Sequence, residues 1–301
     1  MTEAAPNGTR KDKLRRSLML TPGNRPERLA KAATLEVDGV AFDLEDGVAP
    51  EHKSAAREVI NQQLAALDFG HRERLVRINA VGTEDYAADM AQLDFAHVDT
   101  VFVPKVETAD QLARLDDALT AVEMAASRSE PIDVIATIET PRGLLNALSI
   151  ADASARTSAL FFGSGDYSAA TGAAVTEAAL AVPRSTIVAA ASAAGLQSID
   201  AAYFVSVKDA DATADDARLA KELGFDGKVV FHPNQIAVCN DVFSPSADEV
   251  TRAEKIISAY RDAAGSGQGT LYVDGDFIAI DIVLMAERIL DRAAQVAARR
   301  A

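Results

Sequence analysis

Asp133-Val-Ile-Ala-Thr-Ile138 decides the fold class, because it is a short, mostly apolar run that leads directly into Glu139 and a helical stretch from Pro141. Apolar runs of this length are typical of strands in a parallel sheet that is covered on both faces. Seven further runs alternate with helical stretches in the same way: Ser17–Leu20, Val40–Leu44, Leu75–Asn79, Thr100–Val103, Ala159–Phe162, Ser198–Asp200 and Gly227–Val230. Eight strands joined by helical crossovers predict an α/β fold, the (β/α)8 TIM barrel.

A doubly wound open sheet would give the same alternation. No Gly-x-Gly-x-x-Gly motif follows the first strand, which disfavours the dinucleotide-binding form of that fold. We therefore assign residues 14–242 to a TIM-barrel catalytic domain and residues 1–13 to a disordered tail. Residues 243–301 are predicted to be a C-terminal helical extension, too short for a large core of its own. We expect the extension to pack on the barrel or on a neighbouring subunit.

The composition excludes several classes of partner. A formal net charge of −15 disfavours binding to nucleic acid or to an anionic membrane. The apolar stretches fall short of the ~20 residues that a membrane-spanning helix needs. The one cysteine, Cys239, excludes an internal disulfide and fits a reducing compartment. We therefore predict a cytoplasmic protein.

Polar residues follow the predicted strands at the ends that form the active-site rim of a TIM barrel. They are Asp43, Glu45, Asp46, Arg77, Asn79, Lys105, Glu139 and Asp166. So many carboxylates in one cleft repel one another, and a cation relieves that repulsion. Glu139 and Asp166, the latter after a Gly163-Ser-Gly165 turn, suit Mg²⁺, which takes one or two protein carboxylates. The alternative is that both residues cap the helices that follow them.

Three further positions carry weaker signals. Arg77 stands in an apolar strand, where it needs a carboxylate partner: either the substrate or transition state, or Asp43 or Asp46 in a structural ion pair. Arg25 and Lys31 lie around a helix start after a glycine turn, which can hold a phosphate, although an ordinary βα turn has the same residues. For His232, at the end of the last strand, a hydrogen bond to the backbone is favoured over catalysis.

Several segments carry a family resemblance, and they follow one another in order along the chain. They are Arg16-Ser-Leu-Met-Leu-Thr-Pro-Gly23, Asp43-Leu-Glu-Asp-Gly-Val48, Val76-Arg-Ile-Asn79, Val103-Pro-Lys105, Ile138-Glu-Thr-Pro-Arg-Gly143, Phe162-Gly-Ser-Gly-Asp166, Gly224-Phe-Asp-Gly-Lys228 and His232-Pro-Asn-Gln235. In combination they make the chain resemble the citrate lyase beta-subunit-like family, which includes malyl-CoA and citramalyl-CoA lyases. The resemblance implies a TIM barrel with a C-terminal extension, assembled as a trimer or hexamer.

The resemblance also implies a reaction and roles for the rim residues. The reaction is the Mg²⁺-dependent cleavage or formation of a carbon–carbon bond in a 3-hydroxyacyl-CoA, such as malyl-CoA or citramalyl-CoA, giving a 2-oxo acid and a short acyl-CoA. Glu139 and Asp166 would hold Mg²⁺, and Arg77 would stabilise the negative charge that develops as the bond breaks. Asp43, Glu45 and Asp46 would act through water or by orienting Arg77, while Arg25 and Lys31 would reach the CoA nucleotide.

One departure from the family pattern concerns the C-terminal extension. The lyases end with Gly-x-x-Ile/Val-Asp, and that aspartate reaches the active site of a neighbouring subunit and exchanges the methyl proton of the thioester. In this chain Ala279 stands at that position, so Asp276 or Asp281 replaces the acid or the acid is missing. The alternatives to a lyase are therefore a thioester hydrolase on the same metal site and a barrel that binds a CoA ester without turnover.

Overall fold

The structure is a computed structural model that describes residues 13–202, 204–265 and 269–300. Apart from Lys13, the predicted tail lies outside the described residues. Within them, the chain divides into two compact units. The first holds Arg15–Asp241, and the second holds Val242–Arg300 together with Lys13 and Leu14.

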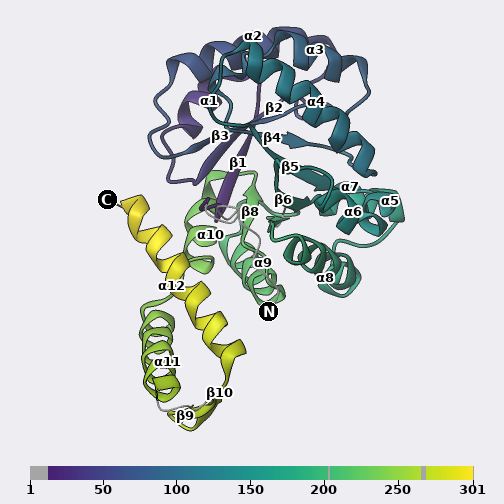
Figure 1. Ribbon diagram of the computed structural model, residues 1–301. Helices are drawn as coiled ribbons and strands as arrows, with labels where there is room; N and C mark the ends of the chain where they lie inside the picture. Colours follow the sequence, from purple (N-terminus) through teal and green to yellow (C-terminus); the bar gives the residue numbers. More distant parts are fainter. Residues whose placement is uncertain (1–12, 203, 266–268, 301) are drawn as a thin grey trace. The chain divides into compact units, whose positions relative to one another are not determined.

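The first unit is a closed barrel of eight strands, in which each strand pairs in parallel with the next and β8 pairs with β1 (Figure 1). The strands are β1 Ser17–Pro22, β2 Gly39–Asp43, β3 Glu73–Arg77, β4 Thr100–Val103, β5 Asp133–Ile138, β6 Thr157–Phe162, β7 Gln197–Ala201 and β8 Gly227–Val230. All eight coincide with predicted strands to within a few residues at each end. The prediction of a TIM barrel is therefore confirmed.

Helices and short 3-10 turns connect the strands. The α-helices are α1 Pro26–Ala32, α2 Lys53–Ala66, α3 Glu84–Gln92, α4 Ala109–Ala125, α5 Pro141–Leu145, α6 Ala147–Ala151, α7 Ser164–Thr171, α8 Glu177–Ala193, α9 Ala210–Leu223 and α10 Ile236–Val242. The 3-10 turns are η1 Pro50–His52, η2 Phe95–His97 and η3 Pro233–Gln235. The glycine-rich segment before Asp166, predicted as a turn, instead begins α7.

The barrel interior positions the rim residues. Its core consists of Leu18, Ala41, Leu75, Phe102, Ile135, Ala159, Phe161, Ile199, Ala201 and Val229, with Leu20 and Phe231 packed against them. Successive side chains of a strand point to opposite faces, so residues two positions apart share a face. Asp43 follows Ala41 in this way, Arg77 follows Leu75, and Glu139 is four residues beyond Ile135. These charged residues therefore continue the inward-facing series at the carboxyl end of the barrel.

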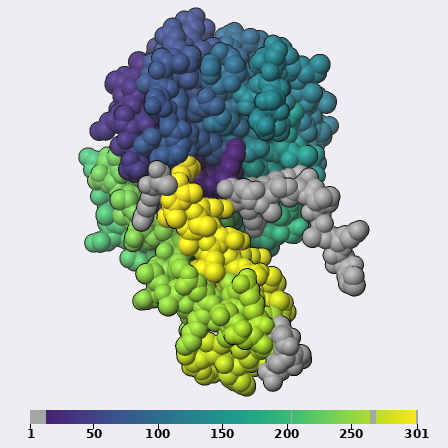
Figure 2. Space-filling view, turned by 60° about the vertical axis from the view of Figure 1, so that its left-hand side comes forward, coloured from purple at the N-terminus to yellow at the C-terminus, as the bar shows by residue number. Residues whose placement is uncertain are grey.

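The second unit is a small helical body with a hairpin, so the predicted helical extension is present. It contains α11 Ala247–Gly265, β9 Leu271–Val273, β10 Asp276–Ile278 and α12 Ile280–Arg300. Figure 2 shows the segment of α11 and α12 in light green to yellow. Apolar residues of both helices and of the hairpin share one core, which includes Ile256, Val273, Ile278 and Val283. No helix in the described part of the chain has both the length and the apolar character that crossing a bilayer requires.

A buried ion-pair network joins β7 and β8 to the helices outside them. Lys228 of β8 is fully buried, and its Nζ lies 2.7 Å from Asp200 of β7 and 2.6 Å from Asp216 of α9. Arg184 of α8 contacts the same two carboxylates. Removing one member of such a network leaves charge buried without compensation, which is strongly destabilising.

We therefore expect Lys228→Met to lower the free energy of unfolding by about 3–5 kcal/mol. The matched control is Lys255→Met, which removes an exposed pair with Asp274 and should change stability by less than about 1 kcal/mol. Urea unfolding of the two variants and the wild type measures both values. Equal losses in the two variants would contradict a special role of the buried network.

Candidate active site

Asp43, at the end of β2, is fixed by its own loop. Its carboxylate oxygens accept hydrogen bonds from the backbone N–H groups of Glu45 and Gly47, each at 2.9 Å. Any side chain at position 47 would collide with Asp43, since a Cβ there would lie 2.1 Å from Oδ2. The loop after β2 is therefore wrapped around Asp43, and this leaves Glu45 buried and Asp46 exposed.

Arg77, at the end of β3, uses its whole guanidinium fork on this loop. Nε and Nη2 donate to the two carboxylate oxygens of Asp43 at 2.7 and 2.6 Å, and Nη1 lies 3.0 Å from Glu45 Oε2. Burial by itself would lower the pKa of Arg77, but the hydrogen bond and charge of Asp43 raise it above its ordinary value. Of the two ion-pair partners predicted from the sequence, Asp43 is confirmed. The alternative partner, Asp46, is wrong, because the loop turns Glu45 toward Arg77 instead.

Lys105, just after β4, links the acidic loop to β5. Its backbone is in the left-handed region with φ of 53°, which is uncommon for a residue other than glycine. Its backbone N–H donates to Glu139 Oε1 at 2.7 Å, while its Nζ contacts Glu45 and lies 3.4 Å from Asp46. The hydrogen bond and charge of Glu45 outweigh burial and raise the pKa of Lys105. The sequence placed Lys105 at the rim but gave no signal of this bridging role.

Glu139 and Asp166 form a carboxylate pair at the ends of β5 and β6. Glu139 is only 2% exposed and packs against Gly163, where a Cβ would lie 2.6 Å from Glu139 Oε2. Asp166 is exposed in the first turn of α7. Burial raises the pKa of Glu139 to about 8, and the charges of Asp166 and Glu45 contribute to the increase. Because β5 and β6 are neighbouring strands, the two carboxylates stand at the same part of the rim, where like charges repel.

The helix-cap alternative for this pair is wrong. The N-cap of α5 is Thr140, whose side chain accepts from the Gly143 N–H at 3.0 Å. The N-cap of α7 is Gly163, which has no side chain to offer. Neither carboxylate is therefore the N-cap of the helix that follows it.

The other candidates lie further from this cluster or have structural partners. Asn79 turns to α3, where its backbone and side-chain N–H groups donate to Asp89 at 2.7 and 2.8 Å. The His232 Nδ1 accepts from the Asn234 N–H and caps a 3-10 turn, as the favoured structural interpretation requires. Arg25 and Lys31 are exposed at opposite ends of α1, roughly 9 Å apart along the helix axis.

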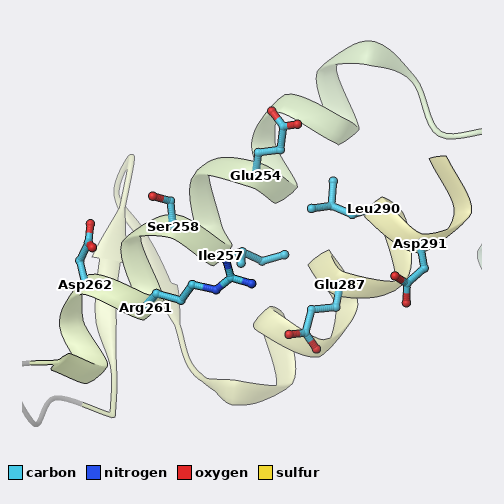
Figure 3. A pocket seen from close by; sticks show the side chains of 8 residues that line it. All are labelled: Glu254, Ile257, Ser258, Arg261, Asp262, Glu287, Leu290 and Asp291. Atoms are coloured by element: carbon cyan, nitrogen blue, oxygen red, sulfur yellow. The ribbon is translucent and has the colours of Figure 1, made fainter. Parts of the chain in front are cut away.

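A hollow lies in the C-terminal unit, between α11 and α12 (Figure 3). It encloses about 510 Å³ and is lined by Glu254, Ile257, Ser258, Arg261, Asp262, Glu287, Leu290 and Asp291. Exposed polar groups surround a floor of Ile257 and Leu290, and none of the predicted site residues lines it. In the described ranges, no group of three or more histidine, cysteine or carboxylate side chains is arranged as metal ligands. Since none of the predicted site residues lines this hollow, the barrel rim, where they gather, is the better candidate for an active site.

Comparison with known proteins identifies the family. The model of the HpcH/HpaI aldolase/citrate lyase family matches residues 16–233, which include every strand of the barrel. The citrate lyase subunit beta of Leuconostoc mesenteroides subsp. cremoris is 33% identical over 93% of this chain and 93% of its own length. The (3S)-malyl-CoA thioesterase of Cereibacter sphaeroides (strain ATCC 17023) is 34% identical over 95% and 97%, and the mitochondrial citramalyl-CoA lyase of Rattus norvegicus is 31% identical over 94% and 87%.

A solved structure extends this similarity to three dimensions. CitE from Mycobacterium tuberculosis, in complex with magnesium, acetoacetate and coenzyme A, superposes with a TM-score of 0.74. The two chains are 34% identical, and the match covers 92% of this chain and 97% of CitE. The resemblance predicted from the ordered motifs is thus confirmed, and both a lyase and a thioesterase occur among the relatives. With its barrel matched from β1 to the end of β8, the chain belongs to the HpcH/HpaI aldolase/citrate lyase family.

Proposed function

We propose that this chain is a Mg²⁺-dependent carbon–carbon lyase acting on a 3-hydroxyacyl-CoA such as malyl-CoA or citramalyl-CoA. The products are a 2-oxo acid and a short acyl-CoA, and the reaction is reversible. The observation that carries the proposal is the guanidinium of Arg77, fixed by Asp43 at the same rim as the Glu139/Asp166 pair. A citramalyl-CoA lyase among the relatives, and magnesium with coenzyme A in CitE, support it.

The residues at the rim fit Mg²⁺. Glu139 and Asp166 offer carboxylate oxygens, the ligands that Mg²⁺ prefers, and it needs only one or two of them. Burial, and after it the negative charges of Asp166 and Glu45, raises the pKa of Glu139, and a divalent cation would relieve the repulsion between these charges. When bound, Mg²⁺ supplies a Lewis acid and a template for the carboxylate and carbinol oxygens of the substrate.

Arg77 is preorganised for the charge that develops during cleavage. As the carbon–carbon bond breaks, the carbinol hydroxyl gives its proton to a carboxylate of the rim and its carbon becomes the carbonyl of the 2-oxo acid. The electron pair of the broken bond passes to the thioester enolate. Because Asp43 holds the guanidinium plane in place, Arg77 stabilises this negative charge without reorganising. Glu45 and Lys105 form an ion pair beside it, and Asp46 is drawn to Lys105.

The enolate must then receive a proton, and the second unit offers a candidate donor. Ala279 lies directly before α12, at the position where the resemblance implies an aspartate. Asp276 is paired with Arg252 at 2.5 Å, whereas Asp281 is exposed in the first turn of α12. We propose Asp281 as the replacement, acting on a neighbouring subunit of a homo-oligomer (trimer or hexamer) in the cytoplasm. The exposed Arg25 and Lys31 would bind the phosphates of the CoA nucleotide.

In domain terms, we propose that residues 14–242 are the catalytic barrel and residues 243–301 the extension.

A thioester hydrolase on the same site is the second candidate. It is favoured by Ala279, because hydrolysis needs no acid to exchange the methyl proton, and by the (3S)-malyl-CoA thioesterase among the relatives.

Product analysis tests the proposed function directly. The protein is incubated with Mg²⁺ and either malyl-CoA or citramalyl-CoA, and the products are separated. We expect a free 2-oxo acid and a short acyl-CoA. Free CoA with a diacid would identify a hydrolase instead, and intact substrate in both incubations would contradict either enzyme.

The pKa of Glu139 makes the stability of the metal-free protein depend on pH. The carboxyl group holds its proton up to about pH 8 when folded but loses it near its ordinary pKa when unfolded, so stability falls as pH rises between these values. With a chelator present, we expect the free energy of unfolding of the wild type to fall by about 2–4 kcal/mol more than that of Glu139→Gln between pH 5.5 and 8.5. Urea unfolding measures this difference, with Glu58→Gln, an exposed glutamate of α2, as the control.

These variants, together with Asp166→Asn, test the metal site. Mg²⁺ should stabilise the wild type and the Glu58→Gln control, because a ligand that binds only the folded state favours it. Glu139→Gln and Asp166→Asn should lose this effect and the calorimetric heat of Mg²⁺ binding. Unchanged Mg²⁺ affinity in both variants would refute the assignment.

A point charge cannot replace the planar fork of Arg77, so Arg77→Lys should lower kcat/KM by roughly 100-fold or more. Arg74→Lys is a matched control, because Arg74 lies on the same strand and makes a similar fork with Asp99 on the outside of the barrel. That control should keep kcat/KM within a few-fold of the wild type. A similar loss in both variants would indicate a structural effect on β3 rather than a catalytic role.

A further inference from the structure

We infer that the mouth of the barrel has an apolar wall, formed by Leu20 and Phe231, that binds an alkyl substituent on the carbinol carbon of the substrate. This inference rests on the proposed function for its substrate, and it names the feature that selects among substrates. It predicts that a 2-oxo acid with a methyl group binds in preference to one with only hydrogen.

The exposure of these two residues locates the wall. Leu20 follows Leu18 with the inward parity of β1, and Phe231 follows Val229 in the same way, and both pack against the core inside the barrel. Leu18 and Val229 are at most 1% exposed, whereas Leu20 and Phe231 are half-buried. An inward-facing side chain of a closed barrel is reached from solvent through an end of the barrel. Phe231 directly follows β8 and Leu20 stands two residues before the end of β1, so both lie in the carboxyl-terminal part of the barrel and face the mouth.

The wall lies opposite the charged residues in the order of the strands. The charged residues stand at or just after the carboxyl ends of five successive strands, β2 to β6. In strand order they are Asp43, Arg77, Lys105, Glu139 and Asp166. The remaining sector consists of β7, β8 and β1, which are adjacent because the barrel is closed. Its inward residues toward the carboxyl end include Ala201, Phe231 and Leu20, with Pro22 as the last inward position of β1. The charged residues therefore occupy the sector of β2 to β6, and the apolar residues occupy the smaller sector of β7, β8 and β1.

The apolar wall is held in place before any ligand arrives. The backbone N–H of Phe231 donates to Gln235 Oε1 at 2.9 Å, and Gln235 is fully buried. On the adjoining β6, Phe161 packs edge-on against Phe102 with the ring centres 5.8 Å apart. A fixed apolar surface that solvent can reach favours a ligand that covers it.

The geometry of the substrate carbon connects the two sectors. Its carboxylate and oxygen are drawn to the charged sector, so its remaining substituent and the acyl chain are left for the other directions. A hydrogen there leaves Leu20 and Phe231 wetted, whereas a methyl group removes apolar surface from water. One methyl group in such a pocket changes affinity or kcat/KM by roughly tenfold or more.

The test compares pyruvate with glyoxylate, which differ by this methyl group. Calorimetry with the full chain and saturating Mg²⁺ gives the two dissociation constants for the wild type, Leu20→Ala and Phe231→Ala. We expect each variant to reduce the preference for pyruvate by roughly tenfold. Because glyoxylate is largely hydrated in water, the comparison is made between variants, in which that effect cancels.

The controls separate specificity from folding. Met124→Ala removes an exposed apolar side chain near the C-terminal end of α4 and should leave the preference unchanged. If an alanine variant fails to bind Mg²⁺ or to give a cooperative thermal transition, Leu20→Val and Phe231→Leu take its place, with a smaller shift of the same sign. A preference that is the same in the wild type and in folded Leu20 and Phe231 variants would overturn the inference.

The outcome for the wall is distinguishable from the outcome for the reaction. If neither CoA thioester is cleaved but pyruvate binding depends on Leu20 and Phe231, the proposed lyase is wrong and the apolar wall stands. If citramalyl-CoA is cleaved and the ratio of kcat/KM for citramalyl-CoA to malyl-CoA is unchanged in both variants, the lyase stands and the wall is refuted.

Discussion

The paired hydrogen bonds between Arg77 and Asp43 are the interaction on which the rest of the site depends. The two residues are register partners on neighbouring strands, and Asp43 is itself held by two N–H groups of its loop. From this pair, ion pairs run through Glu45 to the Lys105 side chain, and the backbone N–H of Lys105 donates to Glu139. Five carboxylates (Asp43, Glu45, Asp46, Glu139 and Asp166) face two cations (Arg77 and Lys105), an excess of three negative charges when all are ionised. A site of this kind is completed by a divalent cation and holds a substrate by its oxygens.

Much of this arrangement is predictable from the sequence, because the physics is local. Short apolar runs alternating with helices predict parallel strands, and parallel strands bring the residues at their carboxyl ends to one rim. The partner of Arg77 was harder to predict, since Glu45 and Asp46 are adjacent in the chain. The choice depends on how the loop wraps around Asp43, which buries Glu45 and exposes Asp46. That is a property of the backbone path and leaves no periodic signal.

Other features were missed for equally specific reasons. Left-handed backbone is expected at glycine or asparagine, so nothing in the Val103-Pro-Lys105 segment indicates the positive φ that aims the Lys105 N–H at Glu139. Helix α7 begins at Ser164, with Gly163 as its N-cap, and Gly163-Ser-Gly165 has a composition typical of a turn; yet Gly163 is required there by its close approach to Glu139. The residue that helps to shape the carboxylate pair is thus the one that obscures the helix.

The division of the mouth assigns different properties of the enzyme to different parts of the chain. Charges recognise a carboxylate and an oxygen but are indifferent to an alkyl group, so the rim from β2 to β6 cannot by itself select an acyl chain. An apolar surface can, and Leu20 and Phe231 provide one. Neither sector supplies the proton that an enolate requires after carbon–carbon cleavage. For that step we propose Asp281 at the start of α12, where it is exposed and position 279 is alanine. Under the proposed function, the acid at the start of α12 therefore decides whether the same barrel acts as a lyase or as a hydrolase.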